Sequence, residues 1–125
     1  MPNLNQLFGK RSETDAVTHL KKQGYEILET NYRNRLGEID IIAKDRDTIA
    51  FVEVKARKSK TYGNPKWAVT QKKQRKISMV ALSYLKSTRQ IHAKARFDVV
   101  TVTMNFENTT STIDVIKNAF ELAYG

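Results

Sequence analysis

The sequence predicts an α/β domain whose mixed sheet is flanked by helices. Three observations predict this class. A helical pattern precedes a group of strand-like segments, two of those segments are joined by a short polar turn, and a long amphipathic helix leads to a further strand. The predicted element order is α-β-β-β-α-β. At 125 residues, with 5 glycines and 2 prolines, the chain fits one domain over residues 1–125 with a single core.

Each predicted element follows from the spacing of its apolar residues and from the residues at its ends. Apolar residues every three or four positions predict a helix, whereas clustered β-branched and aromatic residues predict a strand. Gly24 ends the first helix, because glycine readily takes the left-handed conformation found after a helix C-terminus. In chain order, the predicted elements are a helix that begins near Leu7 or at Ser12, strands 25–33, 39–43 and 49–56, a helix over 69–87, strands 96–104 and 113–116, and a short helix over 118–123.

Two features set the expected directions of the strands. The polar residues 44–48 form a short turn, so the strands on either side should pair as an antiparallel β-hairpin. The long helix over 69–87 connects the strand 49–56 to the strand 96–104, and a right-handed crossover would make these two strands parallel. The sheet is therefore expected to be mixed.

Basic side chains concentrate in the middle of the sequence. The net charge is +9, and residues 54–97 contain 13 lysines and arginines but no aspartate or glutamate. Such a stretch attracts polyanions, of which nucleic-acid backbones are the commonest; the alternative is a solvated surface with uneven charge. An anionic membrane is disfavoured, because the helix over 69–87 needs its apolar face for the core. The basic residues expected to contact nucleic acid are Arg57, Lys58, Lys60, Lys66, Lys72, Arg75 and Lys76.

The composition excludes several classes of site. Cysteine is absent, which excludes disulfides, thiolate zinc sites and a cysteine nucleophile. The two histidines, His19 and His92, are too few for a multi-histidine metal centre. Apolar runs reach four residues at most, far below the ~20 needed to span a bilayer, and the first residues lack the pattern of a signal peptide. A cytoplasmic location is expected.

Two acidic residues lie within apolar, strand-like segments. Asp40 stands among isoleucines, and Glu53 is followed two residues later by Lys55 on the same strand face. If the hairpin centres on residues 46–47, the numbers of opposed residues sum to 93, which places Asp40 directly across from Glu53. Their β-carbons would then be about 5 Å apart on one face of the sheet.

Opposed carboxylates repel each other, so a hairpin that holds them needs a cation between them. Lys55 is one candidate. A divalent metal is the other, since two carboxylates and a backbone carbonyl suit Mg²⁺ or Mn²⁺. Two interpretations without a metal stay open: Glu53 and Lys55 as an exposed ion pair, and Asp40 in contact with Arg35 or Lys55. A metal beside a surface that attracts phosphates would suit a phosphodiesterase.

These motifs together resemble a known nuclease signature. Asp40, a gap of twelve residues and then Glu53-Val54-Lys55 resemble the D-x(n)-(D/E)-x-K signature of the PD-(D/E)XK nuclease superfamily, whose restriction-endonuclease-like core has the order α-β-β-β-α-β. More closely, the chain resembles the YraN-like family of small bacterial proteins along nearly its whole length. Ser12 departs from the family pattern, in which glycine is expected before Glu13. The motifs that carry the resemblance are Gly9 with Glu13, Gly24-Tyr25, Asn31-Tyr32-Arg33, residues 37–43, residues 51–57, residues 69–75 and residues 96–100.

The resemblance implies a role for each residue of the signature. Asp40 and Glu53 would hold Mg²⁺ or Mn²⁺, together with the carbonyl of Val54. Lys55 would orient or help to deprotonate the attacking water and would stabilise the developing negative charge. Glu13 resembles the helix glutamate of archaeal Holliday-junction resolvases, which adds to metal binding. The alternative for Glu13 is a first-turn acid placed for the helix dipole.

The expected function is that of a metal-dependent endonuclease acting on DNA rather than RNA, including branched or otherwise structured DNA. Gln71 and Lys73 stand at a helix start where related nucleases place phosphate contacts, with simple solvent exposure as the alternative. Two other functions stay open: a non-catalytic nucleic-acid-binding module on a nuclease scaffold, and an interaction subunit of a DNA repair or uptake assembly. Two-fold pairing would suit a four-way junction, so a homodimer also stays open.

Overall fold

The computed structural model describes residues 4–57, 69–105 and 110–121. Its helices and strands are α1 (Leu4–Lys22), β1 (Glu26–Asn34), β2 (Gly37–Asp45), β3 (Thr48–Arg57), α2 (Gln71–Ser87), β4 (Lys94–Asn105) and β5 (Thr110–Phe120). The predicted order α-β-β-β-α-β is confirmed, and β5 contains the last strand that was predicted over 113–116. Within the described residues, no helix is both long and apolar enough to cross a membrane.

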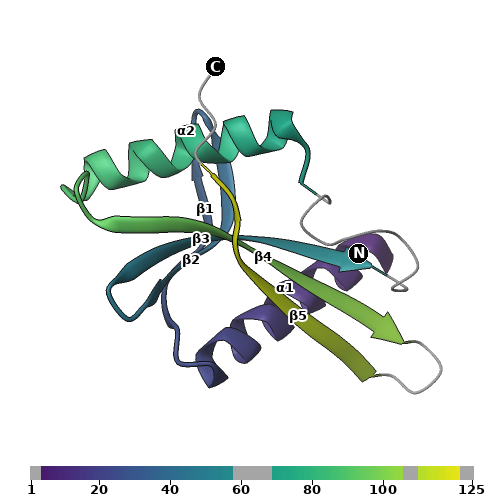
Figure 1. Ribbon diagram of the computed structural model, residues 1–125. Helices are drawn as coiled ribbons and strands as arrows, with labels where there is room; N and C mark the ends of the chain where they lie inside the picture. The colour runs from purple at the N-terminus through teal and green to yellow at the C-terminus, as the bar shows by residue number, and fades with distance from the viewer. Residues whose placement is uncertain (1–3, 58–68, 106–109, 122–125) are drawn as a thin grey trace.

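One sheet forms the middle layer of the molecule, and a helix covers each of its faces. The strands lie in the order β1-β2-β3-β4-β5, with α2 on one side of the sheet and α1 on the other (Figure 1). β3 and β4 are parallel, and the other neighbouring strands are antiparallel. The α/β class, the mixed sheet and the parallel pair joined through the long helix are therefore confirmed.

Two apolar cores hold these layers together. The helix face predicted within 69–87 is buried against the sheet, where the rings of Phe51 and Tyr84 meet edge to face with centroids 5.9 Å apart. On the opposite face, Leu20 of α1 is fully buried among strand side chains. Gly24 ends α1 as predicted: its φ is 94°, and the Tyr25 N–H that follows it donates to the Leu20 carbonyl at 3.0 Å.

The β2–β3 hairpin has the register that the sequence predicted. Its pairs run from Asp45 opposite Thr48 to Ile41 opposite Val52, and the residue numbers of each pair sum to 93. The predicted register, which places Asp40 across from Glu53, is therefore confirmed for the pairs that follow Asp40 along β2.

The short helix predicted over 118–123 is wrong for residues 118–120, which belong to β5. Asn118 has a φ of 53°, and its N–H donates to Asp98 Oδ1 at 2.9 Å. Phe120 pairs with Phe97 on β4, and their rings stack with centroids 4.8 Å apart. These cross-strand contacts stabilise a strand where local helical spacing alone predicted a helix. Residues 122–123 lie outside the described residues.

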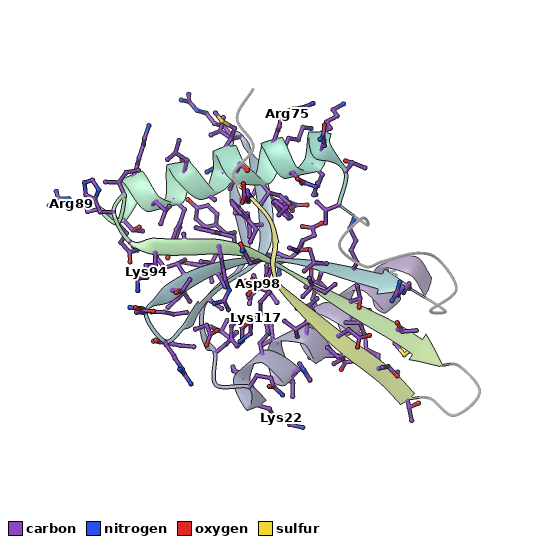
Figure 2. All side chains as sticks on the ribbon, viewed as in Figure 1. Lys22, Arg75, Arg89, Lys94, Asp98 and Lys117 are labelled. Atoms are coloured by element: carbon purple, nitrogen blue, oxygen red, sulfur yellow. The ribbon has the colours of Figure 1, made fainter. Side chains whose placement is uncertain are left out.

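A buried polar network centred on Asp98 ties β4 to its neighbours (Figure 2). The Asp98 carboxylate accepts hydrogen bonds from Arg96 Nε at 2.9 Å, from the Tyr25 hydroxyl at 3.2 Å and from the Asn118 N–H at 2.9 Å. Arg96 also pairs with Asp45 at 2.6 Å. Burial and the charge of Asp98 raise the pKa of Tyr25 to about 12, so its hydroxyl stays protonated and can donate. The polar groups of this network bond to one another, so we assign the network a role in stabilising the fold.

We expect Asp98→Asn to lower the free energy of unfolding by about 2 kcal/mol. The amide has one oxygen in place of two, and its NH₂ group would face a donor inside a buried site. Urea denaturation monitored by circular dichroism measures this loss. Asp47→Asn is the control, since Asp47 forms its ion pair with Lys94 on the surface and should change stability little. Equal stability of the two variants would contradict a structural role for Asp98.

Candidate functional site

The candidate site forms where β2 and β3 stop pairing. The register ends at Ile41 opposite Val52, and Asp40 and Glu53 are the next residues along the two strands. Asp40 Oδ2 accepts a hydrogen bond from the backbone N–H of Val54 at 2.8 Å. The Asp40 side chain therefore reaches across to β3, and its carboxyl lies close enough to that of Glu53 for the two to interact directly.

The carboxyl of Glu53 is buried and incompletely bonded. Its side chain is 6% exposed, and Oε2 has no hydrogen-bond partner among the described residues. Burial, followed by the charge of Asp40, raises the pKa of Glu53 to about 7, while Lys73 and Lys55 act in the opposite direction. Burial also raises the pKa of Asp40, against the effect of its hydrogen bond from Val54. The pair therefore tends to retain one proton at mildly acidic pH.

Two lysines from different elements face Glu53. Lys55 Nζ and Lys73 Nζ each lie 3.7 Å from Glu53 Oε1, and their side chains are 37% and 38% exposed. Lys55 follows Glu53 by two residues on β3, so both project on the same side of the strand. Lys73 lies in the first turn of α2, where its N–H donates to the N-cap hydroxyl of Thr70 at 3.2 Å. The two ammonium groups thus lie between a buried carboxyl and the solvent.

Glu13 approaches the same region from α1. Partial burial, followed by the charges of Asp40 and Glu38, raises the pKa of Glu13, and a hydrogen bond with Asn31 acts against that shift. The amide nitrogen of Asn31, oriented to donate, lies 3.2 Å from Glu13 Oε2. Asn31 has a φ of 52°, a left-handed conformation that asparagine tolerates better than most residues.

The chemistry of the Asp40–Glu53 pair fits a divalent cation. The unpaired Oε2 of Glu53 is a hard oxygen acceptor, and burial raises the pKa of both carboxyls because it disfavours their charged forms, which a bound cation would stabilise. Across the described ranges, no three His, Cys, Asp or Glu side chains gather closely enough to hold a metal. Backbone carbonyl and water ligands would therefore have to complete the coordination. Metal binding stays a prediction for Asp40 and Glu53 as well as for Glu13 and the Val54 carbonyl.

The residues predicted to contact nucleic acid lie in two places. Lys58, Lys60 and Lys66 are outside the described residues. Arg57 donates to Thr103 Oγ1 at 3.3 Å near the end of β3. The exposed members on the first half of α2 are Gln71, Lys72, Arg75 and Lys76. Figure 2 shows Arg75 on the side of α2 away from the sheet. Contact with nucleic acid stays a prediction for all of them.

Two neighbours of the carboxyl pair were missed or assigned another role by sequence reasoning. Lys73 was predicted only as a phosphate contact, although the crossover from β3 to β4 returns the start of α2 towards the end of β3 that carries Glu53. Asn31 was noted only as part of a motif. Asparagine tolerates the left-handed backbone conformation better than most residues, so an asparagine inside a predicted strand could have indicated the positive φ that Asn31 has.

Known proteins align with this sequence over most of its length. The model of the family described as "Uncharacterised protein family UPF0102" matches residues 12–102. A UPF0102 protein of Desulfosudis oleivorans is 50% identical over 121 residues, which cover 97% of this chain and 95% of the relative. A UPF0102 protein of Syntrophus aciditrophicus is 54% identical over 117 residues, covering 94% and 91%. Among solved structures, the chain is similar to Pyrococcus furiosus SfsA in complex with Ca²⁺, at 13% identity and a TM-score of 0.40, over 90% of this chain and 62% of that one.

Proposed function

We propose that this chain, which belongs to the UPF0102 family, is a divalent-metal-dependent endonuclease that hydrolyses phosphodiester bonds in DNA. One observation carries the proposal: the carboxyls of Asp40 and Glu53 meet at the point where two strands separate, and one buried oxygen of Glu53 lacks a partner among the described residues. Burying two acids together is unfavourable unless their charge is used or compensated. A metal-binding role explains why they are kept together.

The residues around the pair can perform the steps of phosphodiester hydrolysis. The oxygen of a water molecule bonds to phosphorus, the bond from phosphorus to the leaving sugar oxygen breaks, and that oxygen takes up the proton that the water loses. Asp40 and Glu53 would hold Mg²⁺ or Mn²⁺, which would supply positive charge to polarise the phosphate. Asp40 is held in place by the Val54 N–H, and Glu53 by its burial. The acids are thus oriented before a substrate arrives.

The two lysines supply positive charge on the solvent side of the carboxyls. Lys55 reaches from Glu53 towards solvent, which is a suitable position to orient a water molecule and to stabilise negative charge on the phosphate as it forms. Lys73 offers a second cation from α2 at the same distance from Glu53 Oε1. Concentrated positive charge here would also raise the local concentration of DNA phosphates.

A panel of labelled linear, flapped and four-way DNAs incubated with Mn²⁺ tests the proposed function. We expect wild-type protein to cleave at least one of them in Mn²⁺ and none in EDTA, because hydrolysis needs the metal-bound carboxyl pair. The double variant Asp40→Asn with Glu53→Gln should cleave none of them. Gel analysis of products over time measures the rate. Cleavage by the double variant at the wild-type rate would refute the proposal.

A DNA-binding module without catalysis is the second candidate function. It has one observation in its favour: Lys55 and Lys73 already offer two positive charges to Glu53, so the acid is compensated without a metal. This candidate predicts salt-sensitive binding without a metal requirement and no nicking of any DNA in the panel. The same experiment therefore separates the two functions.

A further inference from the structure

A basic groove is lined by residues of α2 and of the turn that joins β1 to β2. Its volume is about 380 Å³. Lys73 lines the groove and also lies 3.7 Å from Glu53 Oε1, so it links the groove to the proposed active site. The side chains that give the groove its character are Arg33, Arg35, Leu36, Glu38, Lys73 and Lys76.

Positive charge exceeds negative charge in this groove. Arg33 pairs with Glu38 at 2.8 Å, which compensates one cation. Arg35 and Lys76 form no ion pair with a residue in the described part of the chain, and both are exposed. Two cations are therefore available for anionic groups of a ligand, and the neighbouring acids Asp40, which is half-buried, and Glu53, which is buried, do not line the groove.

The turn of the β1–β2 hairpin is held firmly while it exposes a leucine. The Leu36 N–H donates to Asn34 Oδ1 at 2.8 Å, and Asn34 Nδ2 donates to Ser83 Oγ on α2 at 3.4 Å. At Gly37, φ is 148°, and an added Cβ would lie only 3.3 Å from a methyl group of Val80, so the turn packs closely on α2. Leu36 is nevertheless 42% exposed. A single exposed leucine is ordinary, but this one lines a groove together with Arg33 and Arg35.

We propose that this groove selects branched or otherwise interrupted DNA, with Arg35 and Lys76 on backbone phosphates and Leu36 packed against an unstacked base pair. The proposal rests on the proposed function, because DNA held here would lie next to the carboxyl pair. Inserting an apolar side chain into intact duplex costs unstacking energy, whereas a branch point already exposes base faces. Leu36 therefore adds affinity for branched DNA alone, while the phosphate contacts add affinity for any DNA.

Binding in EDTA tests the role of Leu36 without any need for cleavage. We expect Leu36→Ala to lose about tenfold in affinity for a labelled four-way junction and to bind a linear duplex of the same length and base composition as wild type does. Met79→Ala is the matched control, because Met79 is 43% exposed on α2 and does not line the groove. It should bind both DNAs as wild type does.

Salt dependence tests the two cations. We expect Arg35→Ala and Lys76→Ala each to reduce the slope of log Kd against log salt concentration by about 0.9 on both DNAs, since each loses one phosphate contact. Lys94→Ala is the control: Lys94 pairs with Asp47 at 3.0 Å, at the end of β4 that pairs with the start of β3, and should leave the slope unchanged.

Four results would overturn the inference. In the first, wild-type protein binds junction and duplex with equal affinity, and in the second, Leu36→Ala loses the same affinity for both DNAs. In the third, Arg35→Ala and Lys76→Ala both keep the wild-type salt slope. In the fourth, wild-type protein binds an RNA junction of the same sequence as tightly as the DNA junction. Cleavage is scored separately in Mn²⁺. A junction preference that depends on Leu36, without cleavage of any DNA by wild-type protein, would refute the endonuclease and retain the groove as a binding site for branched DNA.

Discussion

Asp40→Asn is expected to reduce DNA cleavage on the order of a thousandfold while changing the DNA dissociation constant by less than about twofold. The amide keeps an oxygen that can accept the Val54 N–H, so the local backbone should keep its conformation. It removes the negative charge that a metal needs, and it also removes the repulsion between Asp40 and Glu53. Single-turnover cleavage in Mn²⁺ and binding in EDTA, measured on the same DNA, separate the two effects.

Glu26→Gln is the control for this variant, because it also neutralises a strand carboxylate. Glu26 is exposed at the start of β1, opposite Lys44 and away from the carboxyl pair. It should cleave as wild type does. If Asp40→Asn retained more than about a tenth of wild-type cleavage, Asp40 would not belong to the catalytic centre. If it lost cleavage and binding together, Asp40 would serve the fold or the DNA contact rather than the reaction.

Much of the fold could be predicted because the informative patterns are local. The hairpin register followed from one short polar turn, and it holds at Ile41 opposite Val52 and at Asp45 opposite Thr48. Once that register is fixed, side chains alternate, so the meeting of Asp40 and Glu53 follows from chain geometry. The parallel pairing of β3 with β4 followed from crossover handedness. The resemblance to the YraN-like family is likewise confirmed, since the UPF0102 family is the same group.

The features that could not be predicted depend on contacts between distant parts of the chain. Asn118 lies in a strand rather than a helix because its N–H reaches the buried Asp98, twenty residues away. The local sequence around Leu36 does not single it out, and Leu36 lines a groove only because the β1–β2 turn lies beside α2. Lys73 was assigned to phosphate binding, yet its distance to Glu53 depends on how α2 packs on the sheet. Local periodicity carries no information about such packing.

Glu53→Gln is expected to stabilise the metal-free protein at pH 8 by about 2–3 kcal/mol, with little effect near pH 4.5. The pKa of Glu53 is raised from 4.5 to about 7 in the folded state, so between these values the folded protein binds more protons than the unfolded chain. Stability of the wild type should therefore fall as pH rises from about 4.5 to about 7. Glutamine avoids that loss, and its NH₂ group can donate to Asp40. Urea denaturation in EDTA across this pH range measures the difference.

At pH 8, a divalent metal should make the wild-type protein more stable than Glu53→Gln, which is the opposite of the order expected without metal. A cation bound between Asp40 and Glu53 stabilises the folded wild type in proportion to the logarithm of its concentration over its dissociation constant, whereas Glu53→Gln has lost one of the two ligands. Raising the Mn²⁺ concentration should therefore increase the melting temperature of the wild type and of the Glu26→Gln control, but not that of Glu53→Gln. If all three responded equally, the cation would bind elsewhere, and the buried pair would be compensated by Lys55 and Lys73 alone.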